Sequence, residues 1–198
     1  MTTGPDPGAV LAPADAFDGS MLYLQGGLAG MGMNVRQDKS FTYSAASGWG
    51  NVTGKGVAAR SSAFGVWDGS HFVVWGGHQD AGLVNDGAYL TGSTWTTMNT
   101  TGAPTPRMLS LRRSGWAFQI KPGFIGILGG QINLQGAGTL TNNGATYDVA
   151  SSQWKPIADW SSGEDHENGV GVWTGKEFVL WSGRNGGTLT GTGERLAF

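Results

Sequence analysis

The strongest constraint on the fold is an apolar stretch that ends in a glycine doublet and recurs along the chain. It reads MLYLQGG at Gly26-Gly27, FVVWGG at Gly76-Gly77 and FIGILGG at Gly129-Gly130, and a variant, FVLWSG, ends at Ser182-Gly183. The first residues of these pairs are separated by 50, 53 and 53 positions. A fixed period of this size indicates a repeat architecture, in which each unit packs against its neighbours.

A short strand-like stretch and a tight turn precede each apolar stretch. The turns are Asp18-Gly19, Asp68-Gly69, Pro122-Gly123 and Thr174-Gly175. Asp-Gly between two apolar runs is a strong hairpin signal, because the turn residues must tolerate positive φ. The second run is continuously apolar rather than alternating, which predicts a strand buried on both faces.

Two further strand-like stretches follow a variable loop. The third stretch holds a tyrosine: Tyr43, Tyr89 or Tyr147. A tryptophan follows six or seven residues later: Trp49, Trp95 or Trp154. Sustained helical periodicity with caps is absent from the sequence. We therefore predict an all-β domain over 1–198, with approximate repeats at 9–56, 57–106, 107–160 and 161–198, the last of them truncated.

This pattern resembles the kelch repeat family, especially its bacterial branch. The stretches VNDGAYLTGSTWTTMNTTGAPTPR, which ends at Arg107, and NNGATYDVASSQW resemble a family consensus unit. The resemblance extends over the chain from about Phe17 and is strongest in the middle two units. It implies a β-propeller of four-stranded antiparallel blades with the innermost strand first, and about four blades in this chain.

The fourth unit ends at Phe198, 16 residues after Ser182, before a tyrosine–tryptophan pair is reached. Three explanations are open: a fragment of a longer propeller, self-association of copies that complete one ring, or a four-bladed ring closed by the N-terminal segment. The prolines in that segment fit an edge strand poorly.

Composition narrows the function. Charged residues make up 13% of the chain and the net charge is −2, so there is no electrostatic signal for nucleic acid or an anionic membrane. The absence of cysteine excludes disulfides and thiolate chemistry. No apolar segment is long enough for membrane insertion, and the N-terminus does not resemble a signal peptide. We expect no cofactor; compartment stays undetermined, and the family resemblance favours a secreted or cell-surface bacterial protein.

Candidate ligand-binding residues lie in the loops that follow the doublets. They are His78, Gln79 and Asp80 in the second unit, Gln131 and Asn133 in the third, and Arg184 and Asn185 in the fourth. In the family these loops face the binding surface, and loops on a rigid scaffold commonly carry function. Ordinary polar loop residues are the competing interpretation.

The nine tryptophans invite a carbohydrate-binding interpretation, but most recur at repeat positions and are predicted to be core. Trp160 is outside the repeat pattern and is the best candidate for an exposed contact. Near it, Glu164, Asp165, His166 and Glu167 form a weak candidate metal site. The alternative for that cluster is a solvated loop between units, because His166 aligns with Arg60 at the start of its unit.

Arg60, Arg107, Arg112 and Arg113 precede first strands, and a structural role between units is expected for them. Since no convergent catalytic set is evident, the favoured function is a non-catalytic module that presents loops to a protein or carbohydrate partner. The alternatives are a mutarotase- or lyase-like sugar enzyme using His78, Asp80, Arg184 or His166, and an assembly domain that another chain completes.

Overall fold

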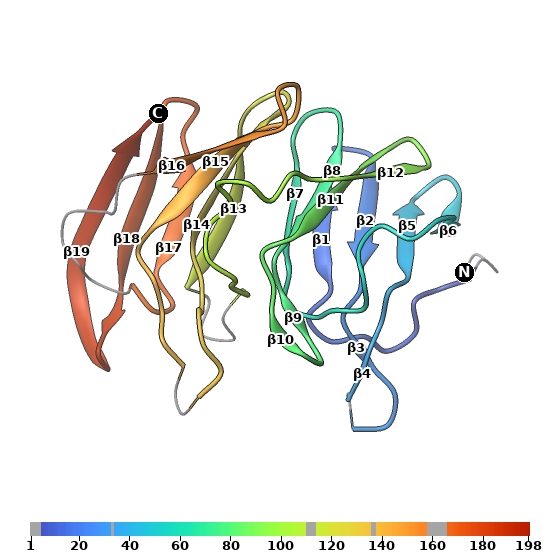
Figure 1. Cartoon of the computed structure of the whole chain (residues 1–198), viewed down its shortest axis with the longest axis horizontal. Helices are drawn as coiled ribbons and strands as arrows, with labels where there is room; N and C mark the ends of the chain where they lie inside the picture. The colour runs from blue at the N-terminus through green and yellow to red at the C-terminus, as the bar shows by residue number, and fades with distance from the viewer. Residues whose placement is uncertain (1–4, 33, 110–113, 136–137, 158–165) are drawn as a thin grey trace.

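The computed structural model contains four successive antiparallel β-sheets, one for each doublet (Figure 1). It describes residues 5–32, 34–109, 114–135, 138–157 and 166–198. No helix is found within these ranges, so the all-β prediction is confirmed.

Three sheets have four strands each. The first is ordered β1 (Ala14–Phe17), β2 (Met21–Gln25), β5 (Ser40–Ser44) and β6 (Gly48–Val52). The second is ordered β7 (Phe64–Trp67), β8 (Phe72–Trp75), β11 (Gly87–Thr91) and β12 (Thr94–Thr97). The third is ordered β13 (Gly115–Lys121), β14 (Phe124–Gly129), β15 (Gly144–Asp148) and β16 (Gln153–Ile157).

The fourth sheet has three strands in the described part of the chain, β17 (Val170–Trp173), β18 (Glu177–Asn185) and β19 (Thr188–Ala197). Two small hairpins extend from the first two sheets, β3 (Leu28–Ala29) with β4 (Val35–Arg36), and β9 (His78–Gln79) with β10 (Gly82–Leu83). The sheets stand in a row, so the first and the fourth lie at opposite ends of the molecule (Figure 1). Leu11, before the first sheet, pairs with Leu28 of the β3–β4 hairpin.

The glycine doublets occupy equivalent places at the ends of the second strands. Gly76 and Gly77 have φ values of 68° and 104°, and Gly129 and Gly130 have 65° and 103°. A Cβ atom on Gly76 would lie 2.6 Å from the carbonyl oxygen of Arg107, in the segment that enters the next sheet. The doublet is therefore required both by the left-handed backbone and by the close approach of the neighbouring chain.

Neighbouring sheets pack face to face through their apolar residues. The first strands lie side by side in chain order, β1 against β7, β7 against β13 and β13 against β17. In the second and third sheets one face packs on the following sheet and the opposite face on the preceding one. The cluster between the second and third sheets contains Phe64, Val66 and Trp75 from one side and Ile127, Tyr147 and Trp154 from the other. The core is thus divided among the spaces between sheets.

Candidate functional site

The loops that follow the doublets lie together along one edge of the row of sheets, at the bottom of Figure 1. We call this the loop edge, formed by the described residues of the ranges 28–37, 78–86, 131–143 and 184–189. An equivalent bridge anchors the start of each loop. The bridges are Leu11 with Leu28, Ser61 with His78, Met108 with Gln131, and Glu167 with Arg184. The repeat therefore sets where each loop begins, and the variable sequence beyond that point sets what it presents.

One cluster joins two of these loops. Arg36, at the end of β4, donates from Nε to the carbonyl oxygen of His78 at 2.9 Å. Its guanidinium also lies 2.9 Å from the His78 Nδ1 atom and 2.5 Å from the Asp80 carboxylate. Because the Arg36 side chain is largely buried while that of Asp80 is almost fully exposed, the carboxylate is the part of the cluster most available to a partner.

The protonation state of His78 follows from these contacts. Burial lowers the pKa of His78 and the Arg36 charge lowers it further, with Asp80 acting in the opposite direction. A guanidinium can only donate hydrogen bonds, so the ring nitrogen facing it must accept. His78 is thus neutral at pH 7, and its ring is held by Arg36.

The other predicted loop residues do not join this cluster. The Gln131 side chain donates to the carbonyl of Asn133 at 2.7 Å, and Asn133 itself bonds Thr139 within the same loop. Arg184 and Asn185 are exposed near the tip of the β18–β19 hairpin. Gln79 pairs with Gly82 across the β9–β10 hairpin. The second loop therefore forms a polar cluster with Arg36. The side-chain amides of the third loop form hydrogen bonds within that loop and fix its conformation.

The acidic segment between the third and fourth sheets is only partly described. Trp160, Glu164 and Asp165 lie outside the described residues. His166 is fully buried rather than solvated, and its Nδ1 lies 2.8 Å from the carbonyl oxygen of Ser182. Glu167 pairs through its backbone with Arg184. Among the residues that the structure describes, no group of three or more metal-ligating side chains is found.

Arg60 and Arg107 connect consecutive sheets. The backbone of Arg60 accepts a hydrogen bond from Gly27 at 2.7 Å, and its guanidinium donates to Gly76 in the next sheet at 2.9 Å. Arg107 repeats this one unit later, between Gly77 and Gly129.

Both arginine side chains are buried, and burial lowers the pKa of Arg107 to about 10. His166 bonds the matching carbonyl of Ser182. Arg60 and Arg107 are structural links, as expected; Arg112 and Arg113 are outside the described ranges.

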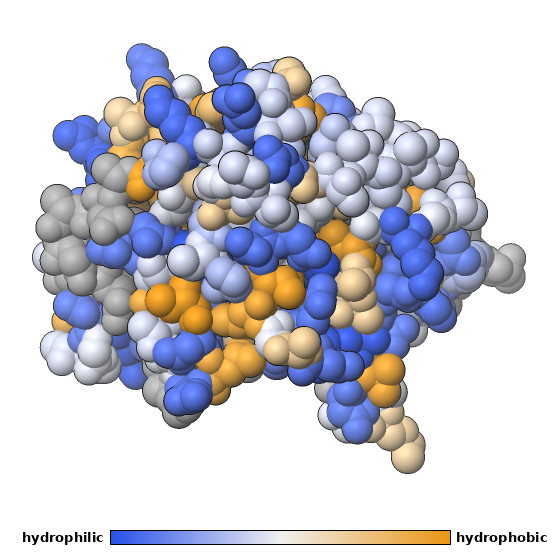
Figure 2. Space-filling view, in the orientation of Figure 1, coloured by the Kyte–Doolittle hydropathy of each residue, from blue (hydrophilic) through white to orange (hydrophobic). Residues whose placement is uncertain are grey.

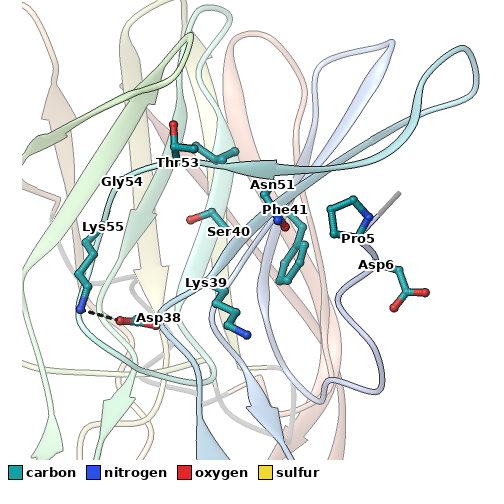
Figure 3. A pocket seen from close by; sticks show the side chains of 11 residues that line it. Pro5, Asp6, Asp38, Lys39, Ser40, Phe41, Asn51, Thr53, Gly54 and Lys55 are labelled. Carbon is teal, nitrogen blue, oxygen red and sulfur yellow. Dashed lines mark ion pairs between the residues drawn. The ribbon is translucent and has the colours of Figure 1, made fainter. Parts of the chain in front are cut away.

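A hollow of about 490 Å³ lies on the outer strands of the first sheet, where Pro5 lies beside Phe41 and Lys55 points to Asp38 (Figure 3). A smaller hollow of about 230 Å³ occupies the corresponding place on the third sheet, where Gly102 and Ala103 enter it. In both units the hollow lies beside the segment that leads into the repeat, Pro5 and Asp6 in one and Gly102 and Ala103 in the other. We therefore assign the hollow to the repeat architecture rather than to a dedicated ligand site.

Arg36 was missed by sequence reasoning, because its loop is too irregular in length to be aligned with the others. The available signal was that it is the lone charged side chain within 28–37.

Comparison with known proteins gives no match, either to a family model or to a curated protein. Within the described ranges, no helix is long and apolar enough to cross a membrane.

Proposed function

We propose that this chain is a kelch-type β-propeller module, whole or partial, that binds another protein through its loop edge and performs no catalysis. The observation that carries the proposal is the chemistry of that edge: the Arg36–His78–Asp80 cluster lies among exposed aliphatic and methionine side chains.

The propeller assignment is supported by the way the units repeat. Each sheet begins with the strand that touches the first strand of the next sheet. Each second strand ends in a doublet that meets the entering chain of the following unit. Sheets joined in this manner turn about a common axis on the side of their first strands, which is the construction of a propeller.

The apolar part of the loop edge favours a protein partner. Its large exposed hydrophobic residues are Met31, Val35, Ile132, Leu134 and Leu189. Figure 2 shows apolar side chains in the lower middle of the molecule, between the loop after β14 and the projecting β3–β4 hairpin. Exposed apolar groups beside an arginine are typical of protein interfaces.

The sequence of the loop edge disfavours a sugar ligand. None of the four loops contains phenylalanine, tyrosine or tryptophan, so none offers the flat ring on which a sugar stacks.

A non-catalytic role is supported by how the polar groups are used. His78 accepts from Arg36, and a histidine held neutral by a cation is a poor proton donor at neutral pH. Gln131 and Asn133 are bonded inside their own loop. His78, Gln131 and Asn133 are therefore engaged in holding the loops.

Selection of displayed random peptides on the immobilised protein tests the proposal. We expect peptides whose binding weakens about tenfold or more on Met31→Ser or Arg36→Ala, the size of effect typical of interface anchors. Val170→Ser is the matched control, because Val170 is also exposed (70%, against 98% for Met31) but lies on strand β17 rather than in one of the loops. Binding only to sugars on a glycan array, or peptides insensitive to the loop variants, would contradict the proposal.

A further inference from the structure

Among the residues that the structure describes, the outer faces of the first and fourth sheets continue the packing pattern of the interior without a neighbouring sheet. In the second sheet the row Phe64, Trp75 and Gly87 is buried against the third sheet. The corresponding row of the fourth sheet is Val170, Trp181 and Gly193. Trp75 is 1% exposed whereas Trp181 is 57% exposed, and Val170 is 70% exposed. We call the face with Val170, Val172 and Trp181 the tail face.

The first sheet carries the complementary face at the other end. Its row consists of four residues that lie directly across from one another on successive strands: Phe17, Leu22, Tyr43 and Trp49. We call this the head face. The corresponding row of the third sheet ends in Trp154, which packs 5.3 Å from Trp75 of the sheet before it. Phe17 is 61% exposed, although its equivalents Trp67 and Trp173 stack on Tyr23 and Phe118 of the preceding sheets.

From this matching we propose that a second copy of the chain docks head to tail, with the tail face of each copy on the head face of the other. Every interior interface joins a tail-type face to a head-type face, so the free pair repeats a contact that the molecule already makes three times. In the docked pair Trp181 packs on Trp49 of the second copy as Trp75 packs on Trp154.

The entering chain does not obstruct this docking. Pro5 and Asp6 lie on the first sheet where Gly102 and Ala103 lie on the third. At the third sheet Gly102 and Ala103 are compatible with a packed neighbouring sheet, so Pro5 and Asp6 leave the head face accessible in the same way.

Four sheets from each copy make eight, which is within the range of about 4–8 blades known for propellers. Head-to-tail contacts that close give a ring rather than a filament. The inference concerns sheet faces and not the loop edge, so it and the proposed function can fail independently.

Light scattering over a concentration series from micromolar to submillimolar tests the inference. We expect the wild type to reach twice the chain mass of 20.6 kDa. Trp181→Ser and Phe17→Ser should each weaken association at least about tenfold. Both side chains are exposed, so each variant should remain folded by circular dichroism. Met31→Ser is the matched control, because this exposed methionine lies in the loop between β3 and β4 rather than on a sheet face.

Mixing the two variants identifies the geometry. A head-to-tail pair regains one intact interface, between the tail face of the Phe17→Ser chain and the head face of the Trp181→Ser chain, so equimolar mixing should restore heterodimers. A tail-to-tail dimer would be unaffected by Phe17→Ser, and that result overturns the inference. A wild type that is monomeric throughout the series overturns it as well.

Discussion

The first two strands of the second and fourth sheets have similar sequences in two different environments. The stretches from Gly65 to Gly77 and from Gly171 to Gly183 share eight of thirteen positions. In the second sheet both faces are covered, whereas in the fourth the tail face is open to solvent. The difference teaches that the residues of a strand specify its conformation, whereas packing on the next sheet stabilises it. The same substitution should therefore change the free energy of unfolding by different amounts in the two sheets.

The largest difference is expected at the tryptophans. Trp75→Ala removes a fully buried side chain from the space between two sheets and should lower the free energy of unfolding by about 3–5 kcal/mol. Trp181→Ala removes a mostly exposed one and should cost about 0.5 kcal/mol or less in the monomer. Urea denaturation at low protein concentration measures both. Equal losses would contradict the idea that the neighbouring sheet supplies the stability.

The hairpin turns should differ next. The Asp68 side chain is fully buried, and its carboxylate accepts from the Ser70 and His71 backbone amides at 2.8 and 2.7 Å. Thr174 occupies the same position with an exposed hydroxyl and longer contacts of 3.4 and 3.2 Å. We expect Asp68→Ala to cost about 1–3 kcal/mol and Thr174→Ala only a few tenths, because only the first leaves buried donors without an acceptor. Thermal unfolding of both variants gives the comparison.

A smaller effect concerns association and arises at the head face. Asp15 occupies the repeat position held by Gly65, Ala117 and Gly171, and burial already raises the pKa of its carboxyl group. A second copy would desolvate this carboxylate further, which opposes docking. Asp15→Gly should therefore tighten association about threefold to tenfold by sedimentation equilibrium, while Asp148→Ala, at a turn inside the row of sheets, should leave it unchanged. Weaker association in Asp15→Gly would show that the head face is not the docking surface.

The smallest effect concerns His78, the counterpart of the exposed Arg184. Its pKa is depressed by burial and by Arg36, so protonation is easier in the unfolded chain. This contribution to stability is complete above the unfolded pKa of about 6.5 and is lost as the pH falls below it. An NMR titration of His78 should give a pKa below that value. Arg36→Ala should raise the pKa of His78, and Asp80→Asn should lower it further. If Arg36→Ala leaves the pKa of His78 unchanged, the Arg36–His78–Asp80 cluster is not part of the site.

Much of the fold was readable from the sequence because its determinants are local. Glycine pairs with positive φ, turns capped by Asp68 and a period near 50 residues each identify an element without knowledge of its neighbours. These features predicted the all-β fold and the positions of the second strands.

The remainder depends on contacts between units, which periodicity does not encode. Trp181 was expected in the core because it recurs at the position of Trp75, and only the absence of a covering sheet in the described chain leaves it exposed. Arg36 reaches His78 from a different sheet, 42 residues away in sequence. Gln131 matched the other loops in position but turns back on its own loop.

The arginine links have a consequence for how the molecule comes apart. Arg60 forms a hydrogen bond with one sheet through its backbone and with the next sheet through its side chain. Unfolding of either sheet therefore breaks a hydrogen bond that Arg60 makes between the two. Stacked units usually unfold gradually from their ends. Here Arg60 and Arg107 couple the first three sheets into one cooperative block, so fraying should begin at the fourth sheet, where His166 at the corresponding position bonds Ser182 of its own sheet.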